Sequence, residues 1–252
     1  MRILTLDSAF TDATIPLLNK LEDYEAQITA LSPRAWWDAS NAAYRTDASG
    51  KCAQLTDRSG GGFHLVQATG VNQPAVTANY WGALNGVSRD ALIFDGATDL
   101  FMQTAGNVFD STNVWTEAMF IRSASTALAV PLGNGTQNWG YFQGPTNIQF
   151  PNTSGVPVAT PTAGTNLALI GTTNYPGSGQ MTATIDVNGT AATLAMANAA
   201  VGTNKAILGC TQASHVFKWN GAVAEAIIFK ADLSGNAPAM AMLKAYFAMK
   251  YR

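Results

Sequence analysis

The sequence contains few charged residues. Asp, Glu, Lys and Arg make up 12% of its 252 residues, which is about half of the roughly 25% found in typical soluble domains. The 14 basic side chains are outnumbered by 16 acidic ones, so the formal net charge is −2. Because a nucleic-acid-binding surface needs clustered cations to neutralise phosphates, this composition excludes a basic nucleic-acid binder. An acidic disordered chain is excluded too, since 47% of the residues are hydrophobic.

Cysteines, export signals and long apolar runs are also scarce. Cys52 and Cys210 lie far apart in the sequence, and two buried thiols are favoured over a single disulfide because nothing indicates export. At the N-terminus, Asp7 interrupts the sequence before the apolar region of a secretory signal could form. No run approaches about 18 uninterrupted apolar residues, so no transmembrane helix is predicted. We therefore expect a chain that is made in the cytoplasm without a signal peptide.

An amphipathic helix is predicted near the N-terminus. Pro16 fits the first turn of a helix, with Thr14 close by as a cap. Pro33 follows Ser32 and ends the helix, because the residue before a proline disfavours α geometry. Two interpretations stay open: the helix packs on its own domain, or its apolar seam serves oligomerisation or anchoring. The seam has heptad spacing and consists of Leu17, Leu21, Tyr24, Ile28 and Leu31.

Residues 90 to 230 have the pattern of an all-β protein. Apolar and polar side chains alternate over residues 181–187, which is the period of a half-buried strand. Asn188-Gly189 follows directly and is typical of a type I′ hairpin turn. Apolar runs at 91–94, 114–121, 167–170 and 223–229 predict further strands, and 152–164 predicts an irregular loop. Many short strands without intervening helices indicate an antiparallel sandwich or jelly roll.

A second amphipathic helix is predicted at the C-terminus. Pro238 fits its first turn, shortly after Asn236. Apolar residues then recur every three or four positions as far as Phe247, and Lys250 continues the same stripe. A helix with one apolar face is expected to lie against the surface of its domain.

Several short segments occur in an order that is known from one protein family. They are residues 33–40 (PRAWWDAS), 55–60, 67–69, 72–74, 94–99, 219–221, 224–229, 233–234, 243–247 and 250–251. Over roughly residues 33 to 252 the chain resembles the concanavalin A-like lectin/glucanase domains of the laminin-G-like jelly-roll group. Such domains occur in phage virion proteins and bacterial surface proteins. The resemblance implies two antiparallel sheets in a jelly roll, although a fold of this kind hosts many functions.

The resemblance also implies a division of the chain. Because the family pattern starts only at Pro33, residues 1–32 are expected to be an added anchoring or oligomerisation segment that contains the heptad helix. Residues 33–252 are expected to form the concanavalin A-like jelly-roll domain. The predicted fold is therefore an all-β antiparallel jelly-roll sandwich with an added N-terminal helix and a C-terminal helix.

The sequence argues against catalysis. Glycoside hydrolysis needs two carboxyl groups across the scissile bond, and catalytic members of the resembled family carry Glu, Asp and Glu at alternate positions of one strand. That motif is absent, so we expect no enzymatic activity. Glu225 is expected to be structural, satisfied by a backbone or arginine partner. The two histidines lie in no nucleophile motif, and with the two cysteines they lack zinc-finger spacing. The chain's glutamates are Glu22, Glu25, Glu117 and Glu225.

Calcium is the one cofactor that the sequence leaves open. Asp57, Asp95 and Asp99 lie in glycine-rich turns, and carboxylate oxygens are the ligands that calcium prefers. The alternative is that Asp57 and Asp95 cap tight turns through their own side chains, and we favour it. Otherwise no cofactor is expected.

Aromatic residues suggest a sugar-binding platform. Tyr80, Trp81, Trp139 and Tyr141 lie in turn-rich sequence beside Asn79, Asn138 and Gln143, and aromatic faces next to amides suit sugar rings. The alternative is that such residues are buried. Burial is the interpretation favoured for the remaining tryptophans at family positions, Trp36, Trp37 and Trp219.

Together these features predict a phage virion structural protein without enzymatic activity, either in a tail fibre or decorating the head or tail. It is expected to be a homo-oligomer, most simply a homotrimer, in contact with other virion proteins. The alternative function is a carbohydrate-binding adhesion module that recognises host-surface glycans. No nucleic-acid or membrane partner is expected.

Overall fold

The computed structural model describes residues 20–98, 100–110, 114–125, 127, 129–134, 142–143, 148–150, 156–158, 162–174, 180–197, 203–211 and 217–251. The helices are α1 (Leu21–Ala30) and α2 (Ala237–Lys250), with short 3-10 turns η1 (Ala42–Tyr44) and η2 (Gly70–Asn72). The strands are β1 (Ala35–Asp38), β2 (Arg45–Ala48), β3 (Lys51–Leu55), β4 (Leu65–Val66), β5 (Ala75–Thr77), β6 (Ala83–Leu84), β7 (Val87–Ser88), β8 (Ala91–Asp95), β9 (Met102–Thr104), β10 (Trp115–Ser123), β11 (Leu132–Asn134), β12 (Phe142–Gln143), β13 (Ile148–Phe150), β14 (Val156–Val158), β15 (Asn166–Asn174), β16 (Gln180–Val187), β17 (Thr190–Ala197), β18 (Ala206–Leu208) and β19 (Asn220–Phe229).

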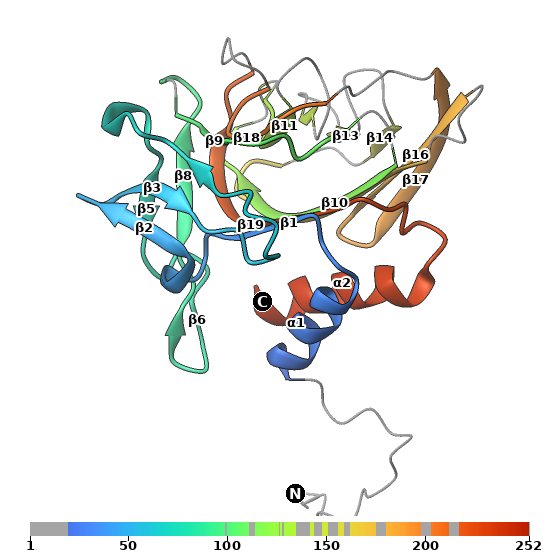
Figure 1. The fold of residues 1–252 in the computed structure, drawn as a ribbon, viewed down its shortest axis with the longest axis horizontal. Helices are drawn as coiled ribbons and strands as arrows, with labels where there is room; N and C mark the ends of the chain where they lie inside the picture. The colour runs from blue at the N-terminus through green and yellow to red at the C-terminus, as the bar shows by residue number, and fades with distance from the viewer. Residues whose placement is uncertain are drawn as a thin grey trace, which may run out of the picture.

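Most of these strands belong to one antiparallel sheet. Its hydrogen-bonded order is β11-β18-β9-β4-β3-β5-β8-β19-β10-β15-β16-β17, with β1 paired to β19 and β2 paired to β3. The sheet curves so that β9, β18 and β11 lie above the layer of β10, β19 and β1, and both helices lie beneath that layer (Figure 1). Two small sheets, β12-β13-β14 and β6-β7, complete the described strands. The predicted all-β antiparallel sandwich with an N-terminal and a C-terminal helix is therefore confirmed.

Local sequence signals account for several elements. Asn188 and Gly189 join β16 to β17 with φ angles of 51° and 91°, the left-handed geometry that a type I′ turn requires. Asn236 caps α2 by accepting a hydrogen bond from the Ala239 backbone N–H, which satisfies one of the free donors at the helix N-terminus. The loop predicted at 152–164 is wrong in part, because β14 forms within it and pairs with β13.

The space between the two layers holds an apolar core. Trp37, Met119, Trp219 and Ile228 are all at most 1% exposed within it. Trp36 is buried on the opposite side of its strand. The burial expected for Trp36, Trp37 and Trp219 is therefore confirmed. Cys52 is a buried thiol whose pKa burial raises to about 12. It forms no disulfide, and neither does Cys210.

A second core lies between the lower layer and the helices. Leu243, Tyr246 and Phe247 of α2 are fully buried in it, against strand residues such as Phe120 and Phe229. The predicted heptad helix is present over its described part, α1. Ile28 is fully buried in the same core, and the half-buried Leu21, Tyr24 and Leu31 pack against it. Leu17 lies outside the described residues.

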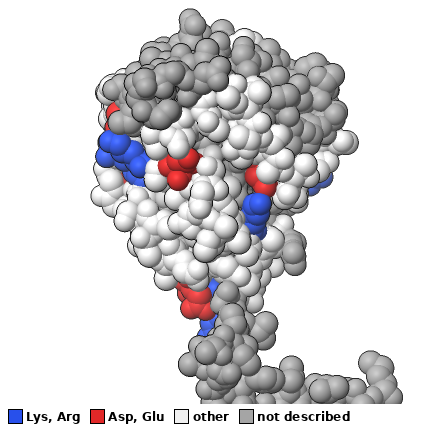
Figure 2. All heavy atoms as spheres, turned by 90° about the vertical axis from the view of Figure 1, so that its right-hand side faces the viewer, with Lys and Arg blue, Asp and Glu red and all other residues white. Residues whose placement is uncertain are grey.

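The described part of the heptad seam thus packs against α2 and the sheet of the same chain. This is the interpretation in which the helix packs on its own domain. Its use in oligomerisation stays a prediction. Neither described helix combines the length and the apolarity needed to cross a bilayer. Figure 2 shows the outcome of the low charge content, since small groups of charged atoms are separated by wide uncharged stretches on the face it presents.

Candidate functional site

Two carboxylates from different strands meet on the helix-facing side of the sheet. Asp38, at the end of β1, is paired in register with Glu225 of β19. A bulge in β19 helps to place Glu225, because the pairing with β10 passes from Phe120–Glu225 to Ile121–Val223 and leaves Ala224 without an opposite residue. Since a bulge changes which face a side chain points to, Ala224 lies in the helix-side core next to Glu225, which itself contacts α2.

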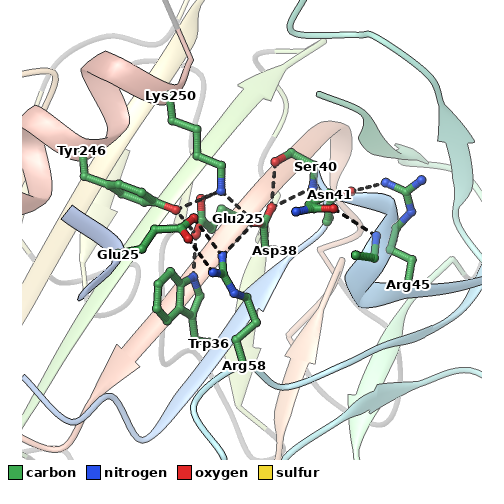
Figure 3. A network of polar contacts seen from close by, with 12 residues as sticks. Glu25, Trp36, Asp38, Ser40, Asn41, Arg45, Arg58, Glu225, Tyr246 and Lys250 are labelled. Atoms are coloured by element: carbon green, nitrogen blue, oxygen red, sulfur yellow. Dashed lines mark hydrogen bonds and ion pairs between the residues drawn. The ribbon is translucent and has the colours of Figure 1, made fainter. Parts of the chain in front are cut away.

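Lys250, at the end of α2, joins the two carboxylates (Figure 3). Its Nζ lies 2.7 Å from Asp38 Oδ2 and 2.9 Å from Glu225 Oε2, and 2.8 Å from the Tyr246 hydroxyl. Glu225 also accepts hydrogen bonds from the hydroxyls of Tyr246 and Tyr251, each at 2.7 Å, and from the Trp36 indole N–H. Since the Lys250 side chain is 5% exposed and that of Glu225 is 0% exposed, this arrangement is closed to solvent.

Arg58 extends the arrangement to α1. Its Nη1 donates to Asp38 at 2.9 Å and its Nη2 donates to Glu25 of α1 at 2.8 Å. The guanidinium also lies over the rings of Trp36 and Tyr44, 4.0 and 4.3 Å from their centroids, a geometry that favours a cation. We call Glu25, Asp38, Arg58, Glu225, Tyr246, Lys250 and Tyr251 the buried charge network.

The pKa directions within the network follow from burial and pairing. Burial alone would raise the pKa of Asp38, but attraction to Lys250 and Arg58 outweighs it and holds the pKa below the ordinary 3.8. For Glu225 burial prevails and the pKa lies above 4.5. The pKa of Lys250 is raised above 10.5, because the two carboxylates outweigh burial. The network joins β1, β19, α1 and α2 through these buried hydrogen bonds and ion pairs.

Two cavities flank the network. The first, which we call the α2 pocket, has a volume of about 350 Å³ and lies between α2 and β10, β15 and β16. Its floor is apolar and aromatic, with Phe120 and Tyr251 stacked at 4.3 Å between ring centroids. Its rim is polar and carries Asn166, Asp186, Asn188 and Lys244.

The polar rim of the α2 pocket is held in place by hydrogen bonds. Asp186 is 2% exposed, accepts from the Gly189 N–H at 2.8 Å and pairs with Lys244 at 2.6 Å. The Asn188 amide accepts from the Ala168 N–H at 2.8 Å and donates to the Asn166 carbonyl at 3.0 Å. These groups are therefore positioned before any ligand arrives.

The second cavity, which we call the α1 pocket, has a volume of about 220 Å³. It lies between α1 and the β6–β7 hairpin and borders the network at Glu25, Asp38 and Lys250. The remaining wall combines both kinds of side chain. The apolar Leu21, Leu84 and Val87 lie beside the hydroxyls of Ser40 and Ser88, the amides of Asn41 and Asn85, and the charged side chains of Glu22 and Arg89.

The aromatic platform expected from the sequence is not assembled by its described members. Trp81 is 8% exposed and belongs to the helix-side core, where its ring packs edge-on against Phe120 and Tyr80. Tyr80 is half-buried and packs against that core. Trp139 and Tyr141 lie outside the described residues, so their part in glycan binding stays a prediction.

Two of the acidic residues considered for calcium, Asp57 and Asp95, accept hydrogen bonds from backbone N–H groups, and calcium binding stays a prediction. Asp57 accepts from the N–H groups of Trp36, Ser59 and Phe63. Asp95 accepts from those of Ala97 and Thr98, as expected of side chains that cap turns. Asp99 lies outside the described residues. No three His, Cys, Asp or Glu side chains in the described part of the chain are grouped to hold a metal ion.

The buried charge network was missed in the sequence, apart from the structural role expected for Glu225. Its partners differ from that expectation, since they are a lysine, two tyrosines and a tryptophan rather than an arginine. One signal was present: Lys250 continues the apolar stripe of α2. A charged residue on a buried helix face needs a partner of opposite charge.

Comparison with known proteins gives matches in structure but not in sequence. No protein-family model matches the chain, and no curated protein matches it. An arabinofuranosidase in complex with arabinofuranosyl-α-1,2-xylobiose has a TM-score of 0.59 at 12% identity, over 87% of this chain and 64% of that one. Domain 4 of an extracellular family-43 arabinanase from Geobacillus stearothermophilus, in complex with arabinotriose, has a TM-score of 0.53 at 13% identity, over 85% and 98%. A Trypanosoma rangeli sialidase has a TM-score of 0.54 at 10% identity, over 85% and 33%.

At these low identities the TM-scores establish a shared β-sandwich fold. The chain spans less than two thirds of the arabinofuranosidase and about a third of the sialidase. The comparisons also correct one sequence prediction. We expected no enzymatic activity because an alternating Glu-Asp-Glu strand is absent, but the structures that share the fold come from glycoside hydrolases. Absence of that one motif is therefore no ground for excluding an enzyme.

Proposed function

We propose that the chain is a carbohydrate-binding β-sandwich domain and that the α2 pocket is its sugar site. The observation that carries the proposal is the pairing of an aromatic floor with a fixed polar rim in that pocket. The arabinanase domain supports it, because that domain shares the fold over 98% of its own length and its structure is a complex with arabinotriose.

The lining of the α2 pocket matches the two kinds of surface on a sugar ring. A sugar presents C–H groups on its faces and hydroxyls at its edge, so it needs an apolar surface beside donors and acceptors. Phe120 and Tyr251 supply the apolar surface. Lys244, whose side chain is 40% exposed, can donate hydrogen bonds to sugar hydroxyls, and its ion pair with the buried Asp186 at 2.6 Å holds it in place. The volume of about 350 Å³ is at the lower end of ligand pockets, roughly 300–1,000 Å³.

Calorimetric titration with arabinotriose, next to an array of neutral oligosaccharides, tests the proposal. Ala248 lines the α2 pocket, and Ala248→Phe places a ring within it. We expect this variant to weaken binding at least about tenfold. Ala241→Phe is the matched control, since Ala241 is an exposed residue of the same helix. Silence across the array, or binding that Ala248→Phe leaves intact, contradicts the assignment of this pocket.

The same array tests the aromatic residues predicted from the sequence. Binding that persists in Ala248→Phe and is lost in Trp139→Ala would move the sugar site to the segment that carries Trp139 and Tyr141. Because Trp81 belongs to a core, Trp81→Ala is expected to lower stability and carries no information on binding.

Glycoside hydrolysis is the second candidate, favoured by the hydrolase origin of the structural neighbours. It needs two carboxyl groups at one cavity, and Glu25 and Asp38 both line the α1 pocket. Release of 4-nitrophenol from its arabinofuranoside, or of reducing ends from arabinan, measures the activity. Loss of turnover in Glu25→Gln with the fold intact would assign it to this cavity. Turnover that Glu25→Gln leaves unchanged would assign it elsewhere.

The biological setting that we propose is a phage virion, in which the domain is a homotrimer in contact with other virion proteins. The low charge content and the family resemblance support this setting. None of the three neighbours described above is a virion protein, so the proposal rests on the sequence. Mass photometry of the full chain tests the oligomer, and a pure monomer at micromolar concentration would contradict it.

A further inference from the structure

Within the described residues we compare four cations that are at most 10% exposed, namely Arg45, Arg58, Lys250 and Arg89, and Arg89 differs from the rest. Arg45 pairs with Asp47 and Asp90, Arg58 with Glu25 and Asp38, and Lys250 with Asp38 and Glu225. Each of these three therefore has two carboxylate partners. The fourth, Arg89, is 6% exposed and has no carboxylate partner within the part of the chain that the structure describes.

The guanidinium of Arg89 is held by backbone carbonyls alone. Its Nη2 donates to the Trp81 carbonyl at 2.7 Å and its Nε to the Gly82 carbonyl at 3.2 Å. Its Nη1 is buried without a hydrogen-bond partner. Burial lowers the pKa of Arg89 from its ordinary value, as expected for a buried cation without a nearby carboxylate. A buried charge without a counter-charge is costly, so natural proteins rarely keep one without a use for it.

Arg89 lines the α1 pocket. The acidic side chains at the inner end of that pocket already have cationic partners, because Glu25 is paired with Arg58 and Asp38 with both Arg58 and Lys250. Among the cations of the lining, Arg89 is the one without a carboxylate in contact with it in the described residues, so a carboxylate brought by a ligand would be its first direct partner. Asn41 and Asn85 add amide groups, and Glu22 adds an exposed negative charge at the rim.

We propose that the α1 pocket binds a hydroxylated carboxylate of monosaccharide size, a sugar acid, whose carboxylate balances the charge of Arg89. The hydroxyls of such a ligand suit the amides of Asn41 and Asn85. Neutral sugars lack the group that balances Arg89, so the pocket discriminates by charge. This site is separate from the α2 pocket, and the inference does not rest on the function proposed there.

Calorimetric titration of the full chain with galacturonate and with galactose tests the inference, because the two sugars differ in one carboxylate. We expect galacturonate to bind at least about tenfold more tightly than galactose. Raising the salt concentration from about 0.05 M to about 0.5 M is expected to weaken galacturonate binding alone, since salt screens charge–charge attraction. Equal affinities, or no galacturonate binding by the folded chain, would overturn the inference.

Two variants assign the effect to this pocket. Arg89→Met is expected to abolish the preference for galacturonate. Because that substitution also removes the bonds to the Trp81 and Gly82 carbonyls, Glu22→Gln provides a variant that leaves Arg89 in place. Removing the exposed like charge at the rim is expected to tighten galacturonate binding severalfold and to leave galactose unchanged. A Glu22→Gln variant that binds both sugars as before would contradict the placement in the α1 pocket.

The variant Ala248→Phe separates this inference from the function proposed above. It fills the α2 pocket and is expected to leave galacturonate binding unchanged. Loss of arabinotriose binding together with retained galacturonate binding would confirm two independent sites. Loss of both ligands in Ala248→Phe would place galacturonate in the α2 pocket and overturn the inference.

Discussion

The two faces of the central strands are buried by different means. On the side of the second sheet layer, β1 and β19 present Ala35, Trp37 and Ile228 to the apolar core between the layers. On the side of the helices, the same strands present Asp38 and Glu225 beside Trp36. Both faces are closed to solvent. On β1 and β19 only the second carries charge, while on the neighbouring β10 the carboxylate of Glu117 is buried on the first, opposite Ile228.

The difference shows what each face requires of its neighbours. An apolar face gains free energy from any close-packed apolar cover, and sheet curvature provides one. A buried carboxylate gains only from donors placed within about 3 Å of it. We infer that the buried charge network fixes where α1 and α2 lie, in addition to the apolar contacts that hold them there. Both pockets are bounded by these helices, so the network positions the candidate sites.

The sharpest test of the comparison removes Lys250. Lys250→Met leaves Glu225 buried without a cation, and we expect a loss of about 3–5 kcal/mol in the free energy of unfolding. Urea denaturation at neutral pH measures it. Met119→Ala, in the apolar core of the other face, is expected to cost about 2–5 kcal/mol through the cavity it leaves.

A second substitution distinguishes the loss caused by an unpaired buried charge from the loss caused by a cavity. Adding Glu225→Gln to Lys250→Met is expected to recover part of the loss, because the unpaired charge is gone. Adding the same substitution to Met119→Ala is expected to lower stability further, since Lys250 then loses a partner. If Glu225→Gln acts in the same direction in both backgrounds, the network does not depend on charge balance.

The two faces also differ in their expected dependence on pH. The pKa of folded Lys250 lies above 10.5 and that of Tyr251 well above 10.0, whereas the unfolded chain releases these protons near the ordinary values. The unfolded state then binds fewer protons above about pH 10, so stability is complete below that pH and falls as pH rises. The slope is about 1.4 kcal/mol per pH unit for each differing proton.

Urea midpoints between about pH 9 and pH 11 measure this slope. Met119→Ala is expected to shift the whole curve without changing its slope, because no titrating group is touched. Tyr251→Phe is expected to make the slope shallower. A wild-type chain whose stability is flat over this range would show that the network does not hold its protons more tightly than the unfolded chain does.

Features set by neighbouring residues could be predicted from the sequence, whereas contacts between distant residues could not. The hairpin at Asn188-Gly189 and the start of α2 at Asn236 depend on neighbouring residues, and both were predicted. The pairing of Asp38 with Glu225 and Lys250 joins positions that are up to 212 residues apart. Such contacts follow from the order of strands in the sheet, which no local pattern specifies. The short strands before residue 90 were missed for a related reason, since they have two to five residues and little periodicity.

Removing the Tyr251 hydroxyl measures how much a single neutral hydrogen-bond donor of the network contributes to stability. Its hydroxyl donates to Glu225 at 2.7 Å and lies 3.1 Å from the Ser40 hydroxyl, and its ring stacks on Phe120. Tyr251→Phe keeps the ring and removes the hydroxyl, so we expect a loss of about 1.5–3 kcal/mol, as for a hydrogen bond to a charged group. Equilibrium unfolding measures it. Tyr44→Phe is the control, since Tyr44 is half-buried and outside the network, and is expected to cost clearly less.

The smallest effect is expected at the edge of the network, where charge meets solvent. The Glu25 side chain is 26% exposed and its partner Arg58 is 10% exposed, so Glu25→Gln is expected to cost only about 0.5–1 kcal/mol. Because Glu25 belongs to α1, the loss is expected to be local. Amide hydrogen exchange should accelerate severalfold in α1 and remain unchanged in β10 and β19. Glu22→Gln, an exposed position on the same helix, is expected to leave both rates as they are. Equal acceleration in α1 and β19 would mean that the outer ion pair stabilises the sheet itself, and the two faces would then be less independent than their composition indicates.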